Sequence, residues 1–222
     1  MRNNKKFANN RIDYIIKLIS PSKKDRILNV GISNIPEIEI VLENRVKECT
    51  TLDIDLEKLN NASKYLRKTK LIKEDINNKP FKNKKFDKVV ILEVLEHLDS
   101  DITALKWINS ILKKRGHIIL SVPNNHPLHI FNPIKYLQHK RHYSNSDILK
   151  KLNNLGFKVE HFNLVENWSL LANLYIHSFF KFFLKKTIPF NTFKKSPNKT
   201  YTQKNSSGLD IIIKAVKVKD LK

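Results

Sequence analysis

The sequence contains little cysteine and no long uninterrupted hydrophobic run at its start. Its single cysteine, Cys49, excludes an intramolecular disulfide and is typical of a reducing compartment, so we expect a cytoplasmic protein. The apolar stretch near the N-terminus is interrupted by Asp13 and Lys17. Charges at these positions indicate an amphipathic helix and argue against a secretory signal.

Acidic residues are scarce relative to basic ones. The chain has 21 Asp and Glu residues against 42 Lys and Arg residues, which gives a formal net charge of +21 at pH 7. A charge of this sign raises nucleic acid or an anionic membrane as a partner. The basic residues are nevertheless spread along the sequence, and Lys, Asn and Ile are abundant throughout, as an AT-rich genome would produce. We therefore favour a compositional origin of the charge over a dedicated nucleic-acid site.

Short apolar segments alternate with segments of helical periodicity along most of the chain. The predicted strands are 26–31, 50–55, 70–76, 86–92, 117–124, 157–166 and 208–218. The predicted helices are 10–20, 37–44, 56–68, a turn and helix from 93 that Gly116 closes, and 144–156, which Ser144 or Ser146 caps and Gly156 ends. This alternation predicts an α/β fold with a mostly parallel, seven-stranded sheet and helices on both faces.

Four residues suited to ligand binding stand at the ends of successive predicted strands. Gly31 follows the first strand, where a glycine permits a sharp turn and the close approach of a ligand. Asp53 ends the second strand and is suited to accept both hydroxyls of a ribose. Asp75 ends the third, where a carboxylate can accept a hydrogen bond from an adenine amino group, and Glu93 ends the fourth. One such acid is often only a helix cap, but three in succession indicate a site at the carboxyl edge of the sheet.

Several segments together resemble a known family. RILNVG, TLDIDLEKLNNA, FDKVVILEVLEHL and RHYSNSDILKKLNNLGFKV are similar, in this order, to small class I methyltransferases of the type 11/23 kind. The resemblance extends over roughly Ile27 to Val165. It implies a Rossmann-like, doubly wound sheet and S-adenosyl-L-methionine as methyl donor. By resemblance, the donor-binding residues are Asn29, Gly31, Ser33, Asp53, Ile54, Asp75, Ile76 and Glu93.

The loop after the first strand departs from the family pattern. That loop usually carries an acid followed by three spaced glycines, whereas this chain has Asn29, Gly31, Ser33 and Ile35. The acid is therefore an amide, and only the first glycine is kept. Two hypotheses follow: the loop binds the methionine end of the donor in an altered way, or the fold has lost the donor and serves as a binding protein.

The segment after the fourth predicted strand holds the candidate catalytic residues. On a helical turn, Glu93, Glu96 and His97 would share one face, and His142 follows later in the chain. These four residues could bind one Mg²⁺ ion, a spacing that resembles the metal-dependent members of the family. Alternatively, the Glu-His pair packs without a metal, and His97, His142 and Glu93 are candidates for the base that removes a proton from the acceptor.

The organisation predicted for the chain has three parts. Residues 1–165 form the core, 166–208 form an apolar helix and a basic loop, and 209–222 form the last strand and a tail. The helix from Trp168 to Leu184 has a single polar stripe and must bury its apolar surface. It caps the acceptor pocket, forms a dimer contact, lies on a membrane through residues 168–186, or packs on the core.

Three hypotheses on function follow. The first is a methyltransferase for a small-molecule, lipid-linked or sugar-linked acceptor, with oxygen as the methylated atom. The second is an enzyme similar to RNA 2′-O-methyltransferases, which the charge favours, although no RNA-binding module is visible. The third is an inactive binding protein, which the altered glycine loop favours. Donor binding separates the third hypothesis from the others, and salt-sensitive RNA affinity separates the second from the first.

Overall fold

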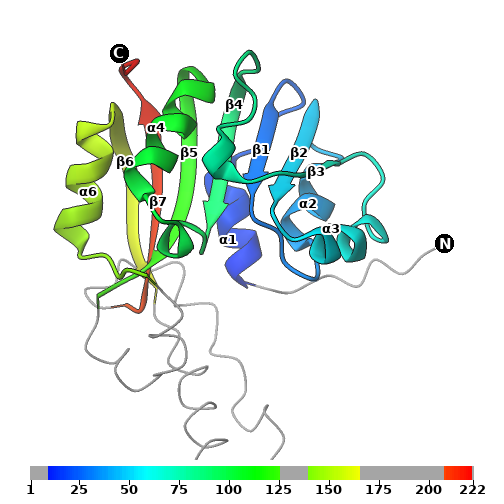
Figure 1. The fold of residues 1–222 in the computed structure, drawn as a ribbon, viewed down its shortest axis with the longest axis horizontal. Helices are drawn as coiled ribbons and strands as arrows, with labels where there is room; N and C mark the ends of the chain where they lie inside the picture. The colour runs from blue at the N-terminus through cyan, green and yellow to red at the C-terminus, as the bar shows by residue number, and fades with distance from the viewer. Residues whose placement is uncertain (1–9, 126–139, 166–207, 222) are drawn as a thin grey trace, which may run out of the picture.

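The computed structural model of the chain describes residues 10–125, 140–165 and 208–221 (Figure 1). The helix predicted from Trp168 to Leu184 and nearly all of the predicted 166–208 segment lie outside these residues. The helices and short 3-10 turns are α1 (Asn10–Ile19), α2 (Glu37–Leu42), α3 (Leu56–Ser63), η1 (Ile76–Asn78), η2 (Leu95–His97), α4 (Asp101–Ile111) and α6 (Asn145–Asn154). The strands are β1 (Arg26–Val30), β2 (Glu48–Asp53), β3 (Lys70–Lys73), β4 (Phe86–Leu92), β5 (Leu112–Pro123), β6 (Phe157–Val165) and β7 (Asp210–Lys217).

The strands form one seven-stranded sheet in the order β3-β2-β1-β4-β5-β7-β6. Strands β1 to β5 are mutually parallel, whereas β7 is antiparallel to both of its neighbours, β5 and β6. The order reverses at β1 and β4, and this switch point is where open α/β sheets bind their ligands. The predicted fold class, a Rossmann-like and mostly parallel sheet, is confirmed.

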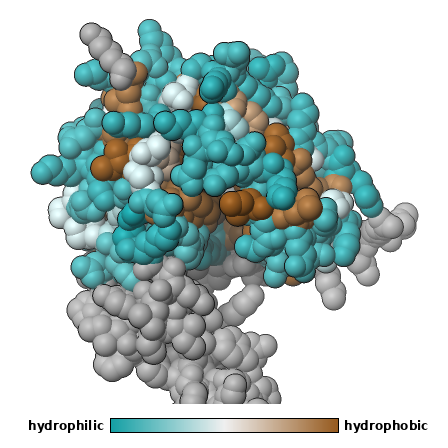
Figure 2. All heavy atoms as spheres, in the orientation of Figure 1, coloured by the Kyte–Doolittle hydropathy of each residue, from teal (hydrophilic) through white to brown (hydrophobic). Residues whose placement is uncertain are grey.

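Successive residues of the central strands pack against opposite layers of helices. In β4, Val89 and Ile91 contact the hydrophobic cluster that contains α4 and α6, whereas Val90 contacts the cluster that contains α1 and α2. All three residues are fully buried. Burial on both faces explains why these strands are continuous apolar runs and not alternating ones. On the face of the molecule shown in Figure 2, most of the surface is hydrophilic, and apolar residues are visible in patches.

The helix that the sequence places between Ser144 and Gly156 is confirmed as α6. Ser144 is its N-cap, because its hydroxyl accepts a hydrogen bond from the amide of Asp147 at 3.1 Å. Gly156 follows the helix with φ of +76°, the left-handed conformation that ends many helices. The alternative cap, Ser146, lies within the first turn.

The prediction that Gly116 closes the preceding helix is wrong. Helix α4 ends at Ile111, and its C-cap Leu112 is already extended. The ammonium of Lys217, a residue only 3% exposed, accounts for this early end, because it donates to the carbonyls of Asn109 at 2.7 Å and Leu112 at 3.0 Å. Gly116 instead lies in β5, and a Cβ there would stand 2.9 Å from the carbonyl oxygen of Lys113.

None of the helices in the described part of the chain has both the length and the hydrophobicity that crossing a bilayer requires.

Candidate functional site

A cleft of about 780 Å³ opens at the carboxyl ends of the parallel strands. Its lining includes every residue predicted to bind the donor, namely Asn29, Gly31, Ser33, Asp53, Ile54, Asp75, Ile76 and Glu93. Of the other predicted site residues, His97 lines the cleft and Glu96 and His142 do not. The volume lies within the range of about 300–1,000 Å³ that is usual for small-molecule sites.

Asp53 ties the loop after β1 to the end of β2. One carboxylate oxygen accepts a hydrogen bond from the amide of Ile32 at 2.7 Å, and the other accepts from the amide of Asp55 at 2.8 Å. The amide of Gly31 donates to the carbonyl of Leu52 at 2.8 Å. Because each carboxylate oxygen can accept more than one hydrogen bond, Asp53 can hold the loop and still accept from a ribose.

Gly31 makes the sharp turn that was inferred for it. Its φ is +86°, which a residue with a side chain rarely adopts. An added Cβ would lie 2.6 Å from a side-chain methyl of Val94, the second residue after β4. The loops after β1 and β4 therefore approach each other closely, and this glycine is needed for their contact.

Asn29 occupies the position at which the family loop usually carries an acid. It is 5% exposed, and its side-chain amide donates to the carbonyl of Gly31 at 2.7 Å and to Oε1 of Glu39 at 2.6 Å. Glu39 lies on α2, is 2% exposed and also accepts from the hydroxyl of Thr51 at 3.1 Å. Burial raises the pKa of the Glu39 carboxyl, and its hydrogen bonds partly offset that rise.

Sequence reasoning missed Glu39 as a site residue. The only pattern in the sequence that pointed to Glu39 was an acid between Ile38 and Ile40, on a short predicted helix just after the donor loop. Such a position is indistinguishable from a solvated helix face until the packing of α2 is known.

The far end of the cleft combines acids with apolar side chains. Asp75 accepts a hydrogen bond from the amide of Asn77 at 2.8 Å and thereby caps η1. Ile76 is buried, whereas Ile54 is 65% exposed although it is a large apolar residue. An exposed isoleucine in the lining of a cleft supplies a surface against which a flat aromatic ring can pack.

Glu93 lies at the switch point and is held by two neighbours. Its Oε1 accepts from a guanidinium nitrogen of Arg11 at 2.8 Å and from the hydroxyl of Ser121 at 2.6 Å. The φ of Glu93 is +54°, so the chain turns sharply at this residue. Sequence reasoning missed Arg11, because only the tertiary fold brings α1 to the end of β4.

The prediction that Glu93, Glu96 and His97 lie on one α-helical turn is wrong. The left-handed backbone of Glu93 and the 3-10 turn of η2 replace the expected α-helical turn. Glu96 is fully buried, and burial together with the charge of Glu93 raises the pKa of its carboxyl. His97, by contrast, has a side chain that is 48% exposed.

The predicted Mg²⁺ site is not assembled. In the part of the chain that the structure describes, no group of three or more His, Cys, Asp or Glu side chains is arranged to hold a metal ion. The described residues include all four predicted ligands, Glu93, Glu96, His97 and His142. Glu96 nevertheless interacts with Glu93, and its Oε1 lies 3.9 Å from Nε2 of His97.

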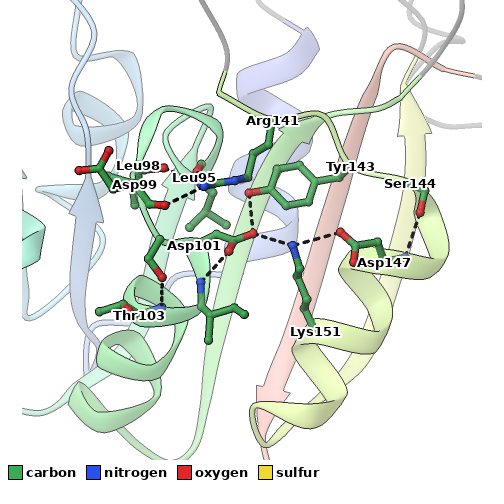
Figure 3. A network of polar contacts seen from close by, with 12 residues as sticks. Leu95, Leu98, Asp99, Asp101, Thr103, Arg141, Tyr143, Ser144, Asp147 and Lys151 are labelled. Atoms are coloured by element: carbon green, nitrogen blue, oxygen red, sulfur yellow. Dashed lines mark hydrogen bonds and ion pairs between the residues drawn. The ribbon is translucent and has the colours of Figure 1, made fainter.

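A polar network holds the segment from Leu95 to Asp99 (Figure 3). The guanidinium of Arg141 donates to the carbonyls of Leu95 at 3.3 Å, Leu98 and Asp99 at 2.8 Å. This segment runs from η2 to the start of α4. Arg141 therefore links the turn after β4 to the chain that leads into α6.

The same network continues through a buried carboxylate. Asp101 accepts from the hydroxyl of Tyr143 at 3.1 Å and from the ammonium of Lys151 at 2.8 Å. Burial opposes the ionisation of Asp101, but the hydrogen bond from Lys151 outweighs it and lowers the pKa. Tyr143 is fully buried, so the RHYS part of the sequence motif is a structural connection between α4 and α6.

The cleft is acidic although the whole chain is strongly basic. Among the described residues, its lining contains seven carboxylates, Glu37, Glu39, Asp53, Glu74, Asp75, Glu93 and Asp99, against three basic side chains, Arg11, Lys58 and Lys140. The chain as a whole has 42 Lys and Arg residues and 21 Asp and Glu residues, so its excess of basic residues lies outside the cleft. A cleft of this kind attracts a cationic ligand and not a polyanion.

The protein is a Rossmann-like domain with an acidic cleft at the carboxyl ends of its parallel strands. Residues 28–120 match the methyltransferase domain family. This match covers the first part of the segment that resembles small class I methyltransferases, and it supports that resemblance. An uncharacterized protein of Methanocaldococcus jannaschii is 36% identical over 95 residues, which are 41% of this chain and 41% of that protein. The match thus spans about two fifths of that relative's length.

Two solved structures of methyltransferases share this fold. N-methyltransferase NodS from Bradyrhizobium japonicum, in complex with S-adenosyl-L-homocysteine, is 14% identical with a TM-score of 0.63, covering 98% of this chain and 90% of that one. Magnesium protoporphyrin IX methyltransferase from Synechocystis, also with S-adenosyl-L-homocysteine, is 15% identical with a TM-score of 0.60, covering 93% and 82%. At sequence identities this low, the similarity to these two structures concerns the fold alone.

Proposed function

We propose that this protein transfers a methyl group from S-adenosyl-L-methionine to an oxygen atom of a small-molecule, lipid-linked or sugar-linked acceptor. The observation that carries the proposal is the acidic cleft, which gathers the loop after β1 and the acids that follow β2, β3 and β4. The donor carries a sulfonium and an ammonium, and both are cations. An acidic lining in a basic protein suits this donor.

The residues of the cleft divide according to the parts of the donor. Asp53 suits the ribose hydroxyls, and Asp75 with Ile54 and Ile76 suits the adenine. The loop backbone around Gly31 also lines the cleft and suits the methionine end. When bound, the donor supplies an electrophilic methyl group and a neutral thioether as leaving group.

The protein's contribution to the reaction is mainly positioning. Holding two reactants in line at reacting distance can supply about 7–11 kcal/mol of the barrier. An acceptor hydroxyl must also lose its proton, and His97 is the candidate base because it lines the cleft with a half-exposed side chain. Glu93 is held by Arg11 and Ser121 and is suited to orient an acceptor hydroxyl.

The acid-rich lining also bears on the RNA hypothesis. Phosphate groups would be repelled by a cleft with more carboxylates than cations, so the described residues favour a small acceptor over RNA at this site. Acceptors with a lipid or sugar part remain within the proposal. The peripheral membrane contact predicted for residues 168–186 concerns a segment outside the described residues.

Calorimetric titration with S-adenosyl-L-homocysteine tests the donor site directly. We expect saturable binding to the wild type and a loss of about 1.5–3 kcal/mol in Asp53→Ala, the usual contribution of hydrogen bonds to a charged group. Asp55→Ala is the matched control, because Asp55 caps α3 and does not line the cleft. A wild type that binds no S-adenosyl-L-homocysteine would refute the proposal.

A further inference from the structure

Glu39 is an acid for which the fold provides little electrostatic compensation. Its side chain is 2% exposed, and its Oε1 accepts from two neutral groups, the amide of Asn29 and the hydroxyl of Thr51. Within the described residues no Lys, Arg or His forms an ion pair with it. Burying a carboxylate without a cation is costly, and such groups concentrate at functional sites.

The position of Glu39 relates it to the donor loop. It lies on α2, directly after the loop, and contributes to the lining of the cleft. Asn29 bridges Glu39 and the carbonyl of Gly31, so the carboxylate, the amide and the loop backbone form one connected unit. The negative group that β1 lacks at Asn29 is thus supplied by the neighbouring helix.

We propose that Glu39 binds the methionine end of S-adenosyl-L-methionine, its carboxylate serving as the counter-charge for the donor ammonium. The inference rests on the proposed function. It accounts for the amide at position 29, since two adjacent buried carboxylates would repel each other. It also accounts for the raised pKa of Glu39, because the cation that would favour its ionised form arrives with the ligand.

The test compares two ligands that differ in the part Glu39 is proposed to bind. S-Adenosyl-L-homocysteine carries the ammonium, whereas 5′-methylthioadenosine has the same nucleoside and no amino-acid part. Glu39→Gln keeps the size of the side chain and an acceptor for Asn29 and Thr51, but removes the charge. We expect affinity for S-adenosyl-L-homocysteine to fall roughly 10- to 150-fold, with affinity for 5′-methylthioadenosine unchanged.

Two further variants complete the design. Glu39→Met is of similar volume and also uncharged, so it is expected to give the same discrimination and replaces the Gln variant if that protein does not fold. Glu43→Gln removes another acid from the C-cap of α2, whose carboxylate accepts from the amides of Arg67 and Lys68 outside the cleft. It is expected to bind both ligands as the wild type does.

The outcomes separate the inference from the proposed function. Equal weakening of both ligands in Glu39→Gln would indicate a structural role and overturn the inference, as would unchanged affinity for S-adenosyl-L-homocysteine. In either case the wild type still binds the donor product, so the proposed function stands. A wild type that binds neither ligand overturns the proposed function and the inference together.

Discussion

Replacing Arg141 tests whether its polar network holds the segment from Leu95 to Asp99, which contains His97. Its guanidinium donates to three backbone carbonyls, those of Leu95, Leu98 and Asp99. The carbonyl of Asp99 is at the surface, where water replaces the lost donor, so it contributes little. The other two bonds are partly buried, and at about 1.5 kcal/mol each Arg141→Met should lower the free energy of unfolding by about 3 kcal/mol.

The measurement combines urea denaturation with hydrogen exchange of the segment from Glu93 to Asp99. Arg141→Lys keeps the charge but not the fork of donors, so we expect about half of the loss and intermediate protection. The control is Lys140→Met, which removes only an exposed ion pair with Asp99 and should change stability by less than about 0.5 kcal/mol. Unchanged stability and unchanged exchange in Arg141→Met would refute the reasoning.

Three further predictions concern the donor loop, the end of α4 and acid stability. Gly31→Ala should lower the free energy of unfolding by about 1–2 kcal/mol and weaken S-adenosyl-L-homocysteine binding, because alanine is strained at φ of +86° and its Cβ meets Val94. If calorimetry finds the wild-type affinity in this variant, the prediction is wrong. Lys217→Met should lower the free energy of unfolding by about 2–4 kcal/mol, since two buried carbonyls lose their donor. Thermal or urea denaturation measures this, and a loss below about 1 kcal/mol would show that water replaces the ammonium. The hydrogen bond from Lys84 lowers the pKa of Glu48 to about 2, below its unfolded value, so its contribution of up to about 1 kcal/mol is complete at neutral pH and is lost as the pH falls from about 4.5 to 2. Glu48→Gln should therefore be less stable than the wild type at pH 7 and equal to it near pH 2, and a constant difference would contradict the assignment.

The elements that sequence analysis predicted correctly are those that local chemistry determines. Strand β4 was predicted with its observed bounds, because a buried parallel strand is a continuous apolar run. The cap of α6 at Ser144 and its end at Gly156 follow from hydrogen bonding and backbone freedom within a few residues. The end of α4 was missed, because it depends on Lys217, more than one hundred residues further along the chain.

The sequence by itself determined the class of fold and the side chains at the carboxyl edge of the sheet. Parallel strands end at one edge, so Gly31, Asp53 and Asp75 had to meet there once the strands were recognised. Only the tertiary structure decided what joins them from other elements. Packing of α2 buries Glu39 against Asn29, and packing of α1 brings Arg11 to Glu93. Such contacts arise from helix placement on a sheet and not from spacing along the chain, which is why no local pattern could predict them.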